Sequence, residues 1–316
     1  MISEKESNFV SAVIYLGSKT QTQCAGKFIN MIYEVLSANF QDYEIICVND
    51  SASGEALNEI EDFNHSKKLS ALSIVNMAGG KFPQGLEESM TAGAEAATGD
   101  YIFEFDSTYV DYDKGVIMQA YNKMSEGFDI VSVNAPKEKI KFSSRLFYAV
   151  YNKFSRTPRE LTTERFRVIS RRALNRIESY SKIIPYRKAV YAFSGVKSAS
   201  INYEALKDSQ GSVQDSDGER FNTAGDAIVL FTNTAYKLSL LFSAIMAFIM
   251  FAFGLYVVFA YFTRSPVEGW APMMGMICLG FLAVFILQTM IFKYLELILR
   301  IEFRKQRYIV TSIERV

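Results

Sequence analysis

The sequence predicts a doubly wound α/β domain with a mostly parallel sheet, followed by a C-terminal hairpin of two transmembrane helices. Up to about residue 230, short β-rich runs alternate with segments of helical periodicity. Beyond that point, two long apolar runs carry no charge. With 49% hydrophobic residues in a chain of 316, the first region can also build a substantial core. These three observations define the expected fold class.

Five short runs are predicted to be β-strands. Each is apolar on both faces, as expected for parallel strands that helices cover on both sides. The runs span 9–16, 43–49, 69–75, 101–105 and 129–133. Amphipathic helices are expected between them, around Phe28 to Leu36, over Leu86 to Ala97 and over Val116 to Met124.

Acidic residues follow two of these strands directly. Asp50 and Ser51 come after the second strand, and Asp106 to Thr108 come after the fourth. In a doubly wound sheet, ligands bind outside the carboxyl ends of the strands, so we expect these residues to face one crevice. Neither G-x-G-x-x-G nor G-x-x-x-x-G-K-[ST] occurs, which argues against a dinucleotide oxidoreductase and a P-loop enzyme.

Composition argues against several other classes of protein. Lys+Arg and Asp+Glu balance at 34 each, so the chain lacks the basic field that nucleic-acid binding needs. His65 is the only histidine, which nearly excludes histidine-based triads and zinc sites. Cys24, Cys47 and Cys278 match no metal-ligand spacing and suggest a reducing compartment.

Two apolar runs near the C-terminus predict a membrane hairpin. Leu238 to Phe262 is uncharged over about 25 residues, more than the roughly 20 that cross the hydrocarbon core, and Met273 to Phe292 follows after a short connection. A buried helical hairpin of a soluble protein is the alternative. Basic residues outside the hairpin outnumber Arg264 in its loop, so both ends are expected in the cytoplasm. The start, MISEKESNFV, lacks a signal-peptide pattern, which fits a multi-pass protein of the cytoplasmic membrane.

Four regions are therefore expected. They are a cytosolic domain (1–206), a loop and juxtamembrane segment (207–236), the hairpin (237–295) and a cytosolic tail (296–316). Within them, 141–156 forms a basic amphipathic helix that either lies on the membrane surface or packs on the sheet. Residues 207–226 are rich in Ser, Asp and Gly and predict a loop.

Several segments together resemble one family. They are YEIICVNDSASG (43–54), AGAEAATGDYIFEFD (92–106), RFRVISRRAL (165–174), VEGWA (267–271) and KYLELILRIEFRKQRYIV (293–310). In order and spacing they resemble the membrane-bound family 2 glycosyltransferases that load sugars onto polyprenyl phosphates, of the dolichol-phosphate mannose synthase type. The resemblance covers nearly the whole chain and implies a GT-A type fold.

The resemblance implies a reaction and roles for named residues. A nucleotide sugar would donate the sugar to polyprenyl phosphate with inversion, at the lipid bilayer, in a homo-oligomer. Mg²⁺ or Mn²⁺ would neutralise the donor diphosphate, with Asp106 as ligand. Asp50, Ser51 and Gly85 would contact the nucleotide. Arg167 and Arg145 would hold the acceptor phosphate, because guanidinium groups pair with phosphate oxygens.

The chain departs from the family's pattern where the chemistry lies. Lys19 stands in a loop where an acidic residue contacts the nucleotide, Thr108 replaces the second carboxylate of the metal motif, and Arg165 replaces an acid. Glu104 could form a substitute pair with Asp106, because residues two apart in a strand point the same way. Asp111 and Asp113 are expected to be solvated, and the alternative is that one of them replaces the lost carboxylate.

Two hypotheses follow, and each site residue has an ordinary structural alternative. The first is an active glycosyltransferase with an altered metal site, and the second is a catalytically inactive relative that serves as a binding or regulatory subunit. A transporter or scaffold is a more distant third. Asp50 could simply cap the following helix, Asp106 could be a turn residue, and Arg167 could be a surface arginine.

Overall fold

The computed structural model describes most of the chain. The described residues are 5–17, 24–50, 60, 72–78, 84–136, 138, 140, 142–154, 160–180, 186–206, 234–264, 269–302 and 310–315. They belong to two compact units, a sheet unit (Met1–Gly225 with Lys305–Val316) and a helical unit (Asp226–Arg304). Each unit is described by itself.

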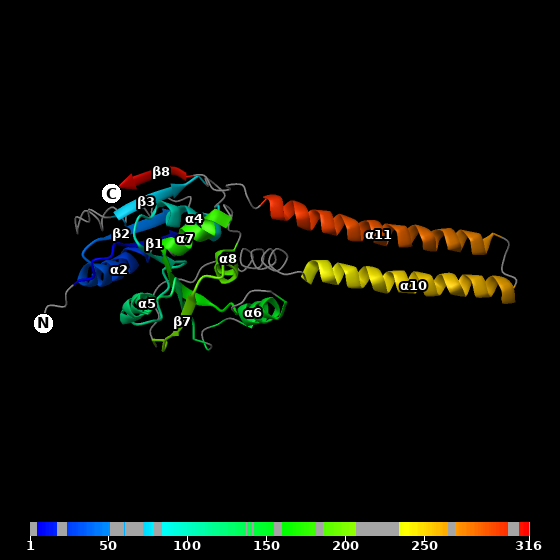
Figure 1. Cartoon of the computed structure of the whole chain (residues 1–316), viewed down its shortest axis with the longest axis horizontal. Helices are drawn as coiled ribbons and strands as arrows, with labels where there is room; N and C mark the ends of the chain where they lie inside the picture. Colours follow the sequence, from blue (N-terminus) through cyan, green and yellow to red (C-terminus); the bar gives the residue numbers. More distant parts are fainter. Residues whose placement is uncertain are drawn as a thin grey trace. The chain divides into compact units, whose positions relative to one another are not determined.

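The sheet unit is built on an eight-stranded sheet in the order β7-β5-β6-β4-β1-β2-β3-β8 (Figure 1). The strands are β1 (Val10–Leu16), β2 (Tyr43–Asn49), β3 (Leu72–Met77), β4 (Tyr101–Phe105), β5 (Ile130–Asn134), β6 (Glu164–Ser170), β7 (Ser198–Asn202) and β8 (Val310–Arg315). All five predicted strands are present within a few residues of their expected bounds. The central strands β4, β1, β2 and β3 run parallel, whereas β6 is antiparallel to both of its neighbours and β8 is antiparallel to β3. The predicted α/β class is confirmed.

Helices cover both faces of the sheet. Helices α2 (Ala25–Asn39) and α5 (Gly115–Ser125) contribute to one apolar cluster. Helices α4 (Leu86–Ala96), α7 (Arg171–Tyr180) and α8 (Arg187–Phe193) contribute to the other. A further helix, α6 (Phe142–Phe154), corresponds to the basic amphipathic segment. Because side chains alternate along a strand, each central strand supplies both clusters.

The α2/α5 face of the sheet is packed with aromatic rings. Phe103 and Phe105 of β4 are buried there. The ring of Phe105 lies 5.3 Å from that of Phe28 and 5.1 Å from that of Phe166. Aromatic pairs at these separations add to the stability that area burial provides. This face forms the larger apolar core.

On the opposite face, α4 lies very close to the sheet. A Cβ atom at Gly93 would lie 2.5 Å from side-chain carbons of both Val13 and Val48. Any larger residue would push the helix away from β1 and β2. The small size of Gly93 therefore serves helix packing.

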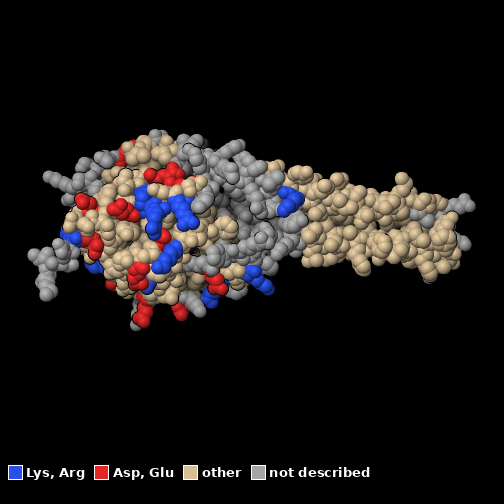
Figure 2. Space-filling model, viewed as in Figure 1, with Lys and Arg blue, Asp and Glu red and all other residues tan. Residues whose placement is uncertain are grey.

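The helical unit consists of two long helices, α10 (Thr234–Arg264) and α11 (Trp270–Glu302). Each holds a stretch long and apolar enough to cross a membrane, Leu240–Thr263 and Pro272–Leu295, with mean hydropathies of 2.4 and 2.3. Only 6% of each stretch is buried, which is unlike the core helices of a soluble protein. The visible face of the two helices carries almost no charged side chain (Figure 2). Thr289 Oγ1 donates a hydrogen bond to Ser243 Oγ across the pair at 3.0 Å.

The segment predicted as a cytosolic tail, 296–316, contains the end of a helix and a strand. Helix α11 continues to Glu302, and β8 then adds to the sheet beside β3. Asn76 of β3 donates to Ser312 Oγ of β8 at 3.0 Å, which adds a side-chain contact to the backbone pairing. The last segment is therefore part of the sheet unit. The predicted loop at 207–226 lies outside the described residues.

Candidate active site

Two acidic residues directly follow strands of the parallel sheet. Asp50 follows β2 and Asp106 follows β4, with β1 between these strands. All three strands run parallel, so both residues lie at the carboxyl edge of the sheet. Asp50 contacts the segment before α4, and Asp106 contacts α8, and these two helices cover the same face. The carboxyl edge on this face is the candidate active site.

Asp50 holds the turn that precedes α4. It is 4% exposed, and it accepts hydrogen bonds from the backbone N–H groups of Gln84 at 2.9 Å and Gly85 at 2.8 Å. Burial raises the pKa of Asp50, and these hydrogen bonds offset part of that effect. Gly85 has a φ of 102°, a backbone conformation that residues other than glycine rarely adopt. Asp50 therefore fixes the start of α4. The residues that directly follow Asp50 in the sequence, Ser51 included, lie outside the described residues.

Asp106 lies between two buried arginines. Arg167 of β6 donates through Nη2 to Oδ2 at 2.6 Å, and Arg187 of α8 donates through Nη2 to Oδ1 at 2.6 Å. The Asp106 side chain is 16% exposed, while those of Arg167 and Arg187 are 1% and 0% exposed. Asp106 is thus the solvent-facing corner of a buried charge cluster. The alternative interpretation of Arg167 as a surface residue is wrong.

Arg187 joins three acidic side chains. Besides Asp106, it contacts Glu104 through Nη1 at 2.9 Å and Glu87 through Nε at 3.0 Å. Its backbone N–H also donates to Glu87 at 2.9 Å. The second oxygen of Glu104 accepts from Tyr191 of α8 at 2.8 Å. One guanidinium group thereby connects α8 to the first turn of α4 and to β4. We call the whole set of buried charged residues the arginine cluster; its members are Glu87, Glu104, Asp106, Glu164, Arg167 and Arg187.

The charges of the arginine cluster stabilise one another. Burial alone would raise the pKa of Asp106, but the charges of Arg167 and Arg187 hold it well below its usual range. Burial would lower the pKa of both arginines, and the neighbouring carboxylates raise it instead. Asp106, Arg167 and Arg187 are therefore ionised at any ordinary pH.

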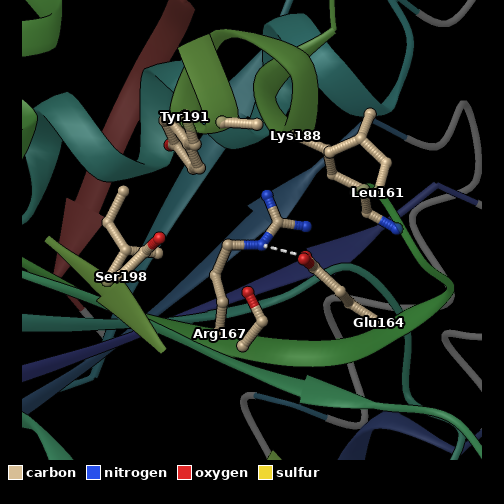
Figure 3. Close-up of a pocket in the computed structure, with 9 residues that line it drawn as sticks. Leu161, Glu164, Arg167, Lys188, Tyr191 and Ser198 are labelled. Carbon is tan, nitrogen blue, oxygen red and sulfur yellow. Dashed lines mark ion pairs between the residues drawn. The ribbon is translucent and has the colours of Figure 1, made fainter. Parts of the chain in front are cut away.

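A small cavity lies beside Arg167 under α8 (Figure 3). Its volume of about 10 Å³ suits a single water molecule. Glu164 contacts Nε of Arg167 at 3.1 Å, and Lys188 and Tyr191 reach the cavity from α8. Nε and Nη1 of Arg167 make no well-aligned hydrogen bond to the described residues. The cavity therefore sits next to unused hydrogen-bond donors.

The remaining predicted residues lie apart from the arginine cluster. Arg145 is exposed on α6, and none of the described contacts of the cluster includes it. Thr108 is buried, and its hydroxyl has no hydrogen-bond partner among the described residues. Asp111 is fully buried and paired with Arg165 at 2.7 Å, so the expectation that it is solvated is wrong. Asp113 is exposed, and Lys19 lies outside the described residues.

Sequence reasoning missed half of the arginine cluster. Glu87, Glu164 and Arg187 were assigned no role, because charged residues in helices and strand ends are usually exposed. The β6 register places Arg167 directly opposite Glu104 on β4, but both of these residues already had assigned roles. No comparable pattern in the sequence indicates Arg187.

The donor atoms do not fit a divalent cation as they stand. Mg²⁺ and Mn²⁺ bind several oxygen ligands, yet both oxygens of Asp106 and both of Glu104 already accept hydrogen bonds. In the described part of the chain, no group of three or more His, Cys, Asp or Glu side chains could hold a metal ion. The expected ligands Asp106 and Glu104 do come together, but around guanidinium groups.

Two solved structures resemble this chain weakly, with low TM-scores and low sequence identity. The mannosyltransferase PcManGT from Pyrobaculum calidifontis, solved with GDP-Man and Mn²⁺, is 13% identical with a TM-score of 0.47, over 62% of this chain and 55% of that one. Glucosyl-3-phosphoglycerate synthase of Mycobacterium tuberculosis is 12% identical with a TM-score of 0.47, over 70% and 78%. The donor and metal are properties of those enzymes.

Sequence comparison gives two relatives and a family. An uncharacterised glycosyltransferase of Synechocystis, sll0501, is 24% identical over 249 residues, which is 77% of this chain and 76% of that protein. The putative glycosyltransferase CsbB of Bacillus subtilis is 24% identical over 221 residues, which is 67% of this chain and 65% of that protein. The family described as glycosyl transferase family 2 matches residues 26–184, half of the chain. The protein therefore belongs to glycosyl transferase family 2.

Proposed function

We propose that this glycosyltransferase is anchored in a membrane and transfers a sugar, with inversion, from a nucleotide sugar to polyprenyl phosphate in glycan assembly. The observation that carries the proposal is the placement of Asp50 and Asp106 at one edge and one face of the sheet, a single strand apart. Ligands of doubly wound sheets bind at such an edge. Membership of the family supplies the transferase activity.

The nucleotide sugar would lie along the carboxyl ends of β1, β2 and β4. Asp50 shapes this end by fixing the turn at Gly85, where a residue without a side chain leaves room beside the backbone. The first turn of α4 follows directly, and the N-terminus of a helix favours negative charge. These features support Asp50 and Gly85 as nucleotide contacts, and the proposal extends to Ser51.

The acceptor chemistry suits a site without histidines. Polyprenyl phosphate is already an anion at neutral pH, so it needs no strong base to attack the sugar. It needs cations that hold its phosphate. Exposed Arg145 could supply one and capture the phosphate from solvent, whereas Arg167, the other arginine that the resemblance assigns to the acceptor, is buried against Asp106. Assembly as a homo-oligomer stays a prediction from the sequence.

The two apolar helices would bring the lipid acceptor to the enzyme. We place both ends of the hairpin in the cytoplasm, because basic residues flank it on the outside. The pairing of β8 with β3 supports that placement, since the segments before and after the hairpin belong to one folded unit. A cytosolic nucleotide sugar and a membrane lipid could then meet at the same protein.

Sugar transfer in membranes tests the proposal. Membranes that contain the full chain are supplied with labelled UDP- or GDP-sugars and polyprenyl phosphate, and lipid-linked label is measured. We expect transfer with at least one donor, and a loss of about 100-fold or more in Asp106→Asn, the scale for removing a charged group that acts on the reaction. Asp113→Asn, an exposed aspartate in the same segment, is the matched control. Unchanged transfer in Asp106→Asn would remove Asp106 from the site.

A second candidate function also has a specific observation in its favour. Both carboxylates that would bind a metal are occupied by arginines, and Thr108 offers no third. A catalytically inactive binding or regulatory subunit could retain the fold in this way. Calorimetry with UDP and GDP separates the two functions. An enzyme must bind its nucleotide and so produce a heat of binding, whereas an inactive subunit is expected to produce none with either nucleotide.

A further inference from the structure

We propose that this site works without a divalent cation, and that the guanidinium groups of Arg187 and Arg167 supply the positive charge for the donor diphosphate. This inference rests on the proposed function, because it concerns the donor that the transferase would bind. It concerns a departure from the metal site that the sequence resemblance implies. Three features of the arginine cluster carry it.

The first feature is that arginines fill the positions a metal would take. One oxygen of Asp106 accepts from Arg167 and the other from Arg187, both at 2.6 Å. Each of these oxygens retains one further lone pair, so a divalent ion that binds Asp106 would lie directly beside a guanidinium group. Repulsion between the two cations, or the loss of a buried partner by a displaced guanidinium group, corresponds to at least about a 100-fold loss of metal affinity.

The second feature is that the acids nearby are committed to arginines as well. Glu104 and Glu87 pair with Arg187, Glu164 pairs with Arg167, and Asp111 pairs with Arg165. At the position where the resemblance implies a second metal-binding carboxylate, Thr108 is buried with an unpaired hydroxyl. No described acid near Asp106 is left to complete a metal site.

The third feature is that the arginines keep donors for a phosphate. Each Nη2 carries two N–H groups. Among the described contacts, Nη2 of Arg187 and Nη2 of Arg167 each give one hydrogen bond, to Asp106. A second N–H of each Nη2 therefore has no partner among the described contacts, next to the Asp106 carboxylate, whose side chain is 16% exposed. Guanidinium groups in this arrangement can bind phosphate oxygens directly.

Lys188 adds a further cation to this region. It belongs to α8, directly after Arg187, and it lines the cavity beside Arg167. No hydrogen bond or ion pair joins its ammonium group to another residue in the part of the chain that the structure describes. Two guanidinium groups and an ammonium group thus lie around one corner of the sheet. A diphosphate bound there would compete with the four carboxylates of the arginine cluster for these cations.

Nucleotide binding with and without metal tests the inference. The full chain in nanodiscs is titrated with UDP and GDP by calorimetry, once in excess EDTA and once in excess Mn²⁺. We expect the same Kd in both, within about threefold, a difference below the tenfold that 1.4 kcal/mol produces. A Kd at least tenfold weaker in EDTA would overturn the inference and leave the proposed function intact. Absence of binding in both buffers would instead overturn the donor assignment, and the inference with it.

Manganese resonance spectra give a readout that does not depend on nucleotide affinity. In the presence of the chain and UDP, we expect Mn²⁺ to keep the spectrum that it has with UDP alone. A protein-bound signal at one ion per chain would contradict the inference. Arg187→Met frees Asp106 and Glu104 from their main partner, so a bound Mn²⁺ signal is expected to appear in that variant only.

Arginine variants test the role of the guanidinium groups. In EDTA, Arg167→Lys retains the charge but loses the fork, and we expect UDP or GDP to bind about tenfold more weakly. Arg187→Met should weaken binding further, and Mn²⁺ should restore only that variant. Arg176→Met replaces an exposed arginine of α7 and is the matched control. If Arg187→Met fails to fold, Arg167→Lys decides alone, and unchanged affinity in that variant would refute the assignment.

Discussion

The two faces of β4 differ in chemical character. Phe103 and Phe105 point into an aromatic core under α2 and α5. Glu104 and Asp106 point the other way and meet Arg167 and Arg187. Four consecutive residues, the last of them directly after the strand, thus supply an apolar face and an ionic face.

The difference shows how the fold separates stability from function. The aromatic face gains from apolar burial and needs no specific partner atoms. The ionic face is stable only while every charge retains its partner, because removing one leaves another buried and unpaired. Perturbing the two faces should therefore have effects of different size and different pH dependence.

The largest effect is expected on the ionic face, from Arg187→Met. This change leaves three acidic side chains without their shared partner, and we expect a loss of about 3–5 kcal/mol in the free energy of unfolding. Pulse proteolysis in urea on the full chain in detergent measures it. Arg176→Met, at an exposed position, should change stability by less than about 0.5 kcal/mol. Equal effects of the two changes would mean that the ion pairs of the arginine cluster do not contribute to the free energy of unfolding.

A smaller effect is expected on the aromatic face, from Phe105→Leu. The shorter side chain loses the contacts with Phe28 and Phe166, and we expect a loss of about 1–2 kcal/mol. Because no titratable group takes part, the loss should be the same at pH 5.5 and at pH 8, which are about the limits of ordinary working pH. The same proteolysis assay at both pH values checks this. A loss that varies with pH would show that the two faces are coupled through β4.

A stabilising change is expected from Glu178→Gln on α7. Burial and the charge of Glu95 raise the pKa of Glu178, and Arg171 offsets this only in part. An acid with a raised pKa in the folded state costs stability once the pH exceeds that pKa, so the benefit of glutamine is absent in acid and appears as the pH rises through the carboxyl range. Glu178 is half-exposed, so we expect a gain of roughly 0.5 kcal/mol or less at neutral pH. A thermal melt at pH 4 and pH 7, on either side of most carboxyl pKa values, measures it. A gain that is equal at both pH values would contradict the assigned cause.

Another small stabilising effect is expected from Thr108→Val. The hydroxyl of Thr108 is buried without a hydrogen-bond partner in the described structure, so a methyl group of the same shape removes an unsatisfied polar atom. Stability should stay the same or rise by up to about 1 kcal/mol. Nucleotide affinity should not change. A loss of affinity in this variant would reveal a ligand role for the hydroxyl that the structure does not suggest.

The parallel strands could be predicted because their signal is local. Residues 101–105 and 43–49 match β4 and β2 at both ends, since each is an apolar run bounded by polar residues. Because the carboxyl ends of parallel strands lie at the same edge of a sheet, Asp50 and Asp106 could then be assigned to one edge. Strand β7 and helix α8 were missed, because their short segments, SASIN and RKAVYAF, have weak periodicity.

The arginine cluster could not be predicted because its partners are distant in sequence. Arg187 contacts Glu87 across 100 positions and Glu104 across 83. A single sequence does not show which charges will meet, so each charged residue is expected at the surface by default. Asp111 shows the same limit, because its partner Arg165 lies 54 positions away. Burial of charge depends on the folded topology and carries no local pattern.

The position of β8 has a consequence for how the protein is made. Residues of β3 leave the ribosome early, but their antiparallel partner is translated only after both helices of the hairpin. Until then, β3 presents an unpaired edge, the kind of surface on which chains aggregate. With the hairpin anchored in a membrane as proposed, insertion of only one of its helices would leave the last strand on the other side from β3. The final six-residue strand would then make completion of the sheet depend on insertion of both helices.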